Sequence, residues 1–208
     1  MTYKPSGLAR LFPRPPNRSL ASFVPTTLGA IDYVASQQNC QVFGTLSCPA
    51  DTLRAVPFWA PDRPGASIGR IAVEVTTGSA SNNIRIGIYQ NVADPKSLYP
   101  GTMLVDSGNI DATTAALKTY ATALALKRNR LYWMVMNTSA SIIVRALNTI
   151  GVSSILGITD GVTGSTTPYN LYISVASAFG VLPSTYPGGG AYVSGTAFTP
   201  VLRYQFAS

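Results

Sequence analysis

Histidine is absent from the 208 residues of this chain. It is the side chain that most often moves protons near neutral pH, and it is a common metal ligand. The eight acidic residues are scattered singly, without the spacing of a metal site or of paired catalytic carboxylates. We therefore predict that the protein is not an enzyme and that it needs neither a metal nor another cofactor.

Charge of either sign is also scarce, at 11% of residues, against roughly 25% in an average soluble chain. The 15 basic residues outnumber the 8 acidic ones, which gives a net charge of +7. Such a balance favours an anionic partner, whether nucleic acid, a charged surface or an acidic protein. No apolar stretch is long enough to span a membrane, and no secretory signal is visible, so we expect synthesis in the cytoplasm without Sec-type export.

Only two cysteines occur, Cys40 and Cys48. A zinc site would need two further ligands. Two alternatives stay open: a disulfide that tightens a hairpin-like turn, or two free thiols, of which we favour the second.

Residues 1–30 contain five prolines, four basic residues and no acidic residue. Proline at this density excludes a continuous helix, and the large apolar residues between the prolines are unusual for a disordered tail. We predict an extended arm that lies across a neighbouring protein, with a flexible terminus as the alternative. The residues expected to anchor it are Arg10, Leu11, Phe12, Arg14, Arg18 and Phe23.

From about residue 52 onward, apolar residues recur at every second position, as in a strand with one buried face. Ile71, Val73 and Val75 are one such set, and a turn at 78–83 separates them from a second set at 84–88. Further strands are expected at Thr102–Ser107, Leu117–Leu126, Leu131–Asn137, Ser141–Leu147, Leu171–Ala176 and Val201–Phe206.

Two of these segments need interpretation. The alanines of Leu117–Leu126 would suit a helix, but its two-residue period favours a strand. Leu131–Asn137 and Ser141–Leu147 lie so close together that we predict a hairpin. The sequence thus indicates an all-β, antiparallel, jelly-roll-like β-sandwich at 52–208, joined to the arm by a connecting segment at 31–51.

Within residues 53–147, short motifs follow one another in a distinctive order. They are Arg85–Tyr89, Pro100–Thr102, Val105–Gly108, Leu131–Trp133 and Val144–Leu147. The set resembles a β-sandwich module of bacteriophage virion proteins, among them tail fibres, head fibres and minor structural proteins. The resemblance implies a virion component, often a homotrimer, whose partners are other proteins of the capsid, neck or tail. It supplies no catalytic residue.

Single motifs that could indicate catalysis, metal binding or nucleic-acid binding are better explained in other ways. Gly65–Gly69 matches the hydrolase elbow pattern, but a strand follows it and no histidine could activate Ser67. Asp106 and Asp111 are better explained as side chains that cap turns than as a glycosidase pair. Asp160–Gly164 resembles a calcium loop only faintly. The basic run Lys127–Arg130 is interpreted as a solvated turn rather than a phosphate contact, so we expect no nucleic-acid partner.

Carbohydrate binding suits a β-sandwich better, since exposed aromatic rings stack on sugar faces. The candidate ligand-binding residues lie in turn-rich segments and are Tyr99, Tyr169, Tyr186 and Tyr192. Trp133 is expected in the core, whereas the exposure of Trp59, between two prolines, stays open. Tyrosine-rich loops serve protein interfaces equally well.

We expect a virion appendage, a fibre or spike assembled in the host cytoplasm, that binds a host-surface polysaccharide. The alternatives are a capsid or tail decoration protein that stabilises the particle, and a free carbohydrate-binding module.

Overall fold

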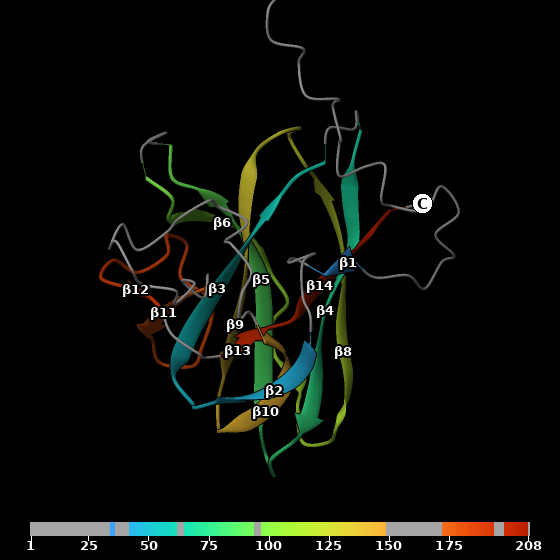
Figure 1. Ribbon diagram of the computed structural model, residues 1–208, viewed down its shortest axis with the longest axis vertical. Coiled ribbons are helices and arrows are strands. Elements are labelled where there is room, and N and C mark those ends of the chain that lie inside the picture. The colour runs from blue at the N-terminus through green and yellow to red at the C-terminus, as the bar shows by residue number, and fades with distance from the viewer. Residues whose placement is uncertain are drawn as a thin grey trace, which may run out of the picture.

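Fourteen β-strands and no helix make up the part of the chain that the computed structural model describes. The described residues are 34–35, 42–61, 65–93, 97–148, 172–193 and 198–207. The predicted arm at 1–30, Cys40 and Tyr169 lie outside them. The strands form two antiparallel sheets packed face to face, which confirms the predicted β-sandwich (Figure 1).

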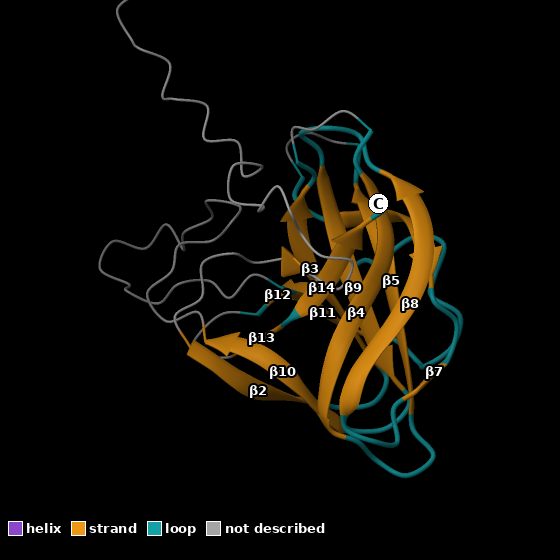
Figure 2. Ribbon diagram, turned by 90° about the vertical axis from the view of Figure 1, so that its right-hand side faces the viewer, coloured by secondary structure: helices purple, strands orange, loops and turns teal. Residues whose placement is uncertain are grey.

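One sheet, which we call sheet A, has seven strands. They are β1 (Val34–Ala35), β2 (Val42–Cys48), β4 (Ser67–Thr77), β8 (Ala116–Ala125), β10 (Ile142–Asn148), β13 (Phe198–Pro200) and β14 (Leu202–Phe206). Strand β8 confirms that the alanine-rich segment is extended. The pair formed by β2 and β10 extends away from the rest of the sandwich (Figure 2).

The other sheet, sheet B, also has seven strands. They are β3 (Thr52–Trp59), β5 (Asn83–Asn91), β6 (Pro100–Asp106), β7 (Ile110–Asp111), β9 (Leu131–Thr138), β11 (Ile173–Ala176) and β12 (Ala191–Tyr192). Strand β9 is central, with β3 along one edge and β5 along the other.

The connectivity is that of a long hairpin wrapped into a sandwich. Strand β5 pairs with β6, β4 with β8, and β3 with β9, so that the pairs are nested and successive pairs lie in alternate sheets. Nesting of this kind is what makes a jelly roll. The loops at the ends of the strands are thereby gathered at the two ends of the sandwich.

The predicted hairpin of Leu131–Asn137 with Ser141–Leu147 is wrong. Strand β9 lies in sheet B, whereas β10 lies in sheet A and pairs with β2, β4 and β13. Both edges of β9 are already occupied by β3 and β5, so the chain has to cross to the other sheet. The expected connecting segment at 31–51 likewise supplies a strand, since β2 pairs with β10 along its whole length.

The main core lies between the sheets and contains the predicted alternating residues. Ile71, Val73 and Val75 from β4 face residues 84, 86 and 88 of β5, and all are at most 1% exposed. Each strand therefore buries one face here, as its two-residue period requires.

A second core lies on the opposite face of sheet B. It is covered by residues 177–190, the cover loop, which connects β11 to β12. Trp133 is fully buried there, as predicted, together with Leu182 and Tyr186 of the loop. Gly87 permits this packing, because a Cβ at that position would lie 2.4 Å from the carbonyl oxygen of Val105 and 2.5 Å from Leu182. The central strand of sheet B, β9, is thus buried on both faces.

Candidate functional site

The tyrosines predicted to bind a glycan belong to the second core. Tyr186 is only 3% exposed, so the expectation that it is accessible is wrong. Its hydroxyl lies 3.2 Å from the carbonyl oxygen of Leu53 and 3.4 Å from that of Ile173, and its ring packs edge-on against Tyr89 and Tyr99. Burial raises the pKa of Tyr186 far above its ordinary value.

Tyr99 and Tyr192 are half-buried, and both hydroxyls point into the protein. Tyr99 donates to the carbonyl oxygen of Pro187 at 2.6 Å and accepts from the amide of Gly190 at 2.9 Å. Tyr192 donates to the carbonyl oxygen of Leu98. The structure therefore brings Tyr99, Tyr186 and Tyr192 together, but as residues that fix the cover loop to sheet B.

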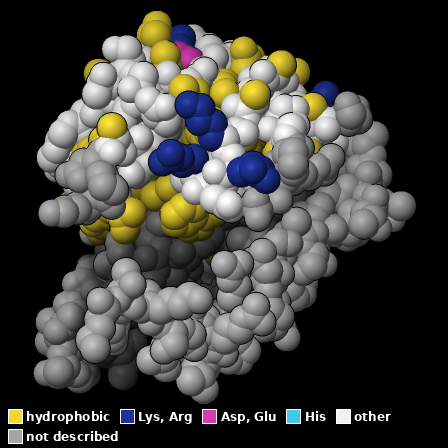
Figure 3. All heavy atoms as spheres, turned by 90° about the horizontal axis from the view of Figure 1, so that it is seen from above, with side chains coloured by type: hydrophobic (Ala, Val, Ile, Leu, Met, Phe, Trp, Pro, Cys, Tyr) yellow, Lys and Arg dark blue, Asp and Glu magenta, His cyan; other side chains and the backbone are white. Residues whose placement is uncertain are grey.

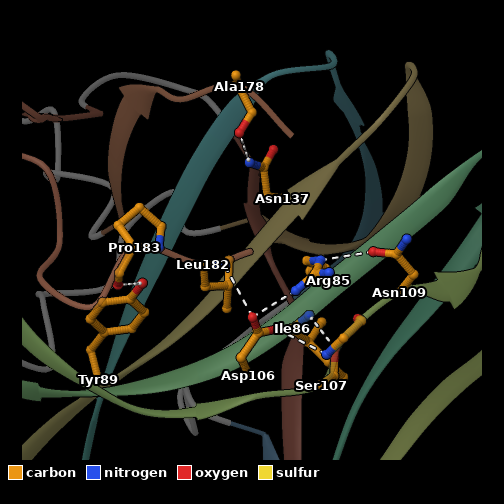
Figure 4. A network of polar contacts seen from close by, with 11 residues as sticks. Arg85, Ile86, Tyr89, Asp106, Ser107, Asn109, Asn137, Ala178, Leu182 and Pro183 are labelled. Carbon is orange, nitrogen blue, oxygen red and sulfur yellow. Dashed lines mark hydrogen bonds and ion pairs between the residues drawn. The ribbon is translucent and has the colours of Figure 1, made fainter. Parts of the chain in front are cut away.

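Asp106 is a second structural residue (Figure 4). Its carboxylate forms an ion pair of 2.7 Å with Arg85, and it accepts hydrogen bonds from the amides of Gly108 and Leu182 at 2.9 and 3.0 Å. Tyr89 approaches the same loop and donates to the carbonyl oxygen of Pro183 at 2.6 Å. Asp106 thus caps a turn, as predicted, and also holds the cover loop.

The other chemical signals of the sequence have similar explanations. Asp111 caps a turn through the amide of Thr113 at 2.9 Å, and this bond lowers the pKa of its carboxyl. Ser67 begins strand β4. Cys48 is a free thiol in the main core, and burial raises its pKa to about 11. Within the described residues, no three His, Cys, Asp or Glu side chains lie close enough to hold a metal ion.

A pocket of about 400 Å³ opens at one end of the sandwich, where β3, β5 and β9 meet their loops. We call it the loop-end pocket. Among the described residues it is lined by Trp59, Gln90, Asn91, Val92, Ala93, Leu98, Lys127, Asn129, Arg130, Leu131 and Tyr132. Its volume falls in the range of roughly 300–1,000 Å³ that is usual for ligand sites.

One wall of the pocket is the basic turn between β8 and β9, and backbone hydrogen bonds fix its position. The amide of Ala60 donates to the carbonyl oxygen of Arg130, and the amide of Leu126 donates to that of Ala66, both at 2.9 Å. The amide of Lys127 donates to the Tyr132 hydroxyl at the same distance. Asn129 has a φ of +54°, a conformation that asparagine tolerates better than most residues.

The opposite wall is the beginning of the β5–β6 loop, and Asn91 positions it. Its side-chain oxygen accepts from the Trp133 indole at 2.9 Å, and its amide donates to the carbonyl oxygens of Val92 and Ser97 at 3.1 and 2.8 Å. Hydrogen bonds to the scaffold therefore hold both walls in place. The other polar side chains of the rim project from this fixed backbone.

The rim combines an aromatic ring with positive charge. Trp59 is 38% exposed. Among the described residues, the other large apolar side chains that are exposed are Leu104, Leu117 and Val181, and none of these is aromatic. Lys127, Arg128 and Arg130 are all exposed on the adjacent turn. Figure 3 looks onto this end of the molecule, where Lys and Arg side chains gather among hydrophobic ones. A ring, cations and amides around one hollow can bind a polar ligand.

No known protein-family model matches this chain, and no curated protein is significantly similar to it. Among the described residues, no helix is long and apolar enough to cross a membrane. The anchoring residues predicted in the arm lie outside the described part of the chain.

The loop-end pocket was not found by sequence reasoning, because its parts lie far apart along the chain. Trp59 is the last residue of β3 and stands between two prolines, whereas the basic turn comes about seventy residues later. A tryptophan beside prolines at a strand end, and a short basic run at a turn, were the available signals. Only the pairing of β3 with β9 joins them.

Proposed function

We propose that the protein is a non-catalytic component of a bacteriophage particle, and that its β-sandwich presents the loop-end pocket to a host-surface glycan. The observation that carries the proposal is the exposed Trp59 beside Lys127 and Arg130, on walls held by backbone hydrogen bonds. An indole face stacks on the apolar face of a sugar ring, while amide and cationic donors bond its oxygens.

The setting on a virion rests on the sequence. The motif order within residues 53–147 resembles phage fibre and minor structural modules, and the proline-rich arm suits attachment to a neighbouring protein. In this proposal the arm anchors the protein to the particle, and the pocket gives it the host-binding role of an appendage. A trimer would present several copies of the pocket together. Repeated weak sites of this kind gain avidity without any new contact.

Two measurements on purified particles test the proposal. Mass spectrometry should find the protein in particles of the wild type, and a chain that lacks residues 1–30 should fold but be missing from them. Particles that carry Trp59→Ala should contain normal amounts of the protein yet adsorb to host cells more slowly. Particles with Leu117→Ala serve as the control, because Leu117 is equally exposed, at 39%, but lies on β8.

Other outcomes would assign a different role. Normal adsorption, together with particles that rupture at lower temperature when the protein is missing, would indicate a decoration protein. Absence from particles, with glycan binding by the isolated chain, would indicate a free carbohydrate-binding module. Either result contradicts the appendage role.

A further inference from the structure

The polar groups of the loop-end pocket are unbalanced in favour of hydrogen-bond donors. Among its described residues, Lys127 and Arg130 can only donate, and no carboxylate lines the hollow. The oxygen of Asn91 is already bonded to Trp133, which removes one of the few acceptors. A neutral sugar can accept hydrogen bonds from these cations through its hydroxyl oxygens, but it supplies no anionic group to pair with their charge.

From this imbalance we infer that the loop-end pocket selects acidic saccharides, those that carry carboxylate or phosphate groups. The inference rests on the proposed function and deepens it by naming the ligand class. Trp59 stacks on the sugar ring, and the cations of the turn pair with its anionic group. Hydrogen bonds between ionised groups are about twice as strong as neutral ones, so this pairing supplies both affinity and selectivity.

The frame of the pocket supports selection rather than general attraction. The turn that carries Lys127 and Arg130 is tied to Ala60 and Tyr132 by hydrogen bonds of 2.9 Å. The cations are thus presented from a fixed backbone, and less conformational entropy is lost when a ligand orders them. A flexible basic tail would attract anions without discriminating among them.

A nucleic acid is the competing anionic ligand, and the site suits it less well. Single strands bind along grooves in which successive bases stack on several aromatic rings. Among the described residues, one exposed ring, Trp59, borders a hollow of about 400 Å³. That geometry fits a unit of one or two sugar rings better than a continuous strand.

The experiment uses the full chain and a panel of immobilised glycans. Half of the panel carries uronate, sialate or phosphate groups, and the other half is neutral. We expect binding to acidic members only, and for any bound uronate the carboxyl-reduced form of the same glycan should bind at least about tenfold more weakly. An oligothymidylate of twenty nucleotides is included as the nucleic-acid probe.

Matched variants locate the site. Lys127→Gln and Arg130→Gln should each weaken binding of the acidic glycans by about tenfold, while Arg70→Gln, an exposed arginine on β4 in the other sheet, should leave it unchanged. Trp59→Ala should abolish binding, and Leu117→Ala should not affect it. Circular dichroism spectra of all variants should match that of the unaltered protein.

Each other result has a distinct meaning. Binding of neutral glycans that Trp59→Ala removes and the charge variants leave unchanged would overturn the inference but keep the proposed function. Binding of the oligothymidylate at least as tightly as any glycan would replace the saccharide with a nucleic acid. No binding to any panel member would overturn both.

Discussion

The cover loop and the loop-end pocket both place aromatic residues in loop regions of the sandwich, but they differ in composition and in where their polar groups point. The cover loop region has tyrosines in a turn-rich sequence, yet the hydroxyls of Tyr89, Tyr99 and Tyr186 all lie within bonding distance of backbone carbonyls. The loop-end pocket has one tryptophan and a basic turn, and there the backbone of the turn is bonded while the side chains of Lys127 and Arg130 are exposed. A loop rich in aromatic residues is thus not a binding surface unless its polar groups remain available.

The difference follows from what each loop has to cover. Sheet B presents an apolar outer face, including Trp133 and Val135, which would be exposed without the cover loop. Burial of that face is favourable at about 25 cal/mol per Å² of apolar surface, so the loop acts as a third layer. The basic turn differs in that the side chains of Lys127 and Arg130 are exposed.

Removal of the Tyr186 side chain should have the largest effect on stability. Tyr186→Ala opens a cavity in the second core, and large aromatic truncations of this kind cost about 3–5 kcal/mol. Urea-induced unfolding measures the loss. Val181→Ala in the same loop, at a residue that is 75% exposed, should be nearly neutral. Equal effects at the two positions would mean that the cover loop is not a packed layer.

Asp106→Asn should have the next largest effect. The change removes the ion pair with Arg85 and weakens the bond to the Leu182 amide, which together should cost about 2 kcal/mol. Amide hydrogen exchange should show faster exchange at Leu182. The control is Asp111→Asn, since Asp111 caps a different turn through the amide of Thr113, and it should leave the Leu182 amide protected.

Tyr192→Phe tests whether the Tyr192 hydroxyl stabilises the fold rather than binding a ligand. The variant loses only the hydrogen bond to Leu98, so the free energy of unfolding should fall by about 1 kcal/mol. Glycan binding should stay at the level of the unaltered protein. A loss of binding with no loss of stability would restore Tyr192 as a ligand contact.

Glu74 on sheet A makes a pH-dependent contribution to the free energy of unfolding. Its carboxylate accepts hydrogen bonds from Arg145 and Arg203 at 2.8 Å, and the bond from Arg145 in particular holds the pKa of Glu74 below its ordinary value of 4.5. A lowered pKa stabilises the fold above pH 4.5, and this stability is lost as the pH falls through the lowered pKa. Glu74→Gln should therefore be less stable near neutral pH, and the difference should shrink on acidification. A difference that does not change with pH would contradict this linkage.

The smallest stability effect is expected at the loop-end pocket. Lys127 and Arg130 are exposed, so each change to Gln should alter the free energy of unfolding by no more than about 0.5 kcal/mol. Thermal unfolding followed by circular dichroism measures it. A large loss would show that these side chains support the fold, and the contrast with the cover loop would fail.

Much of the fold could be predicted from local pattern. The two-residue period of 71–75 and 84–88 identified strands with one buried face, and the same period identified β8 in spite of its alanines. Strand β9 is buried at every position, so its sequence shows no alternation that would reveal its partners. The connection at 139–141 is so short that it predicts a hairpin, although it crosses between the sheets.

The candidate site could be predicted only in part. Tyr186 and Trp59 both stand beside prolines or glycines, and nothing in their neighbours reveals that one is buried and the other exposed. Tyr186 is buried because the loop after β11 packs on the apolar outer face of sheet B. The position of Trp59 depends on the register that places it opposite Leu131. Both are contacts between distant segments.

Local sequence pattern is enough to specify the fold class of this protein, because its alternating apolar residues require half-buried strands. Contacts between distant segments select which aromatic residues are buried in the core, such as Tyr186, and which lie at the rim, such as Trp59. Strand pairing and the layering of sheets are set by the total burial of apolar surface over the whole chain, and no local window of sequence contains that information.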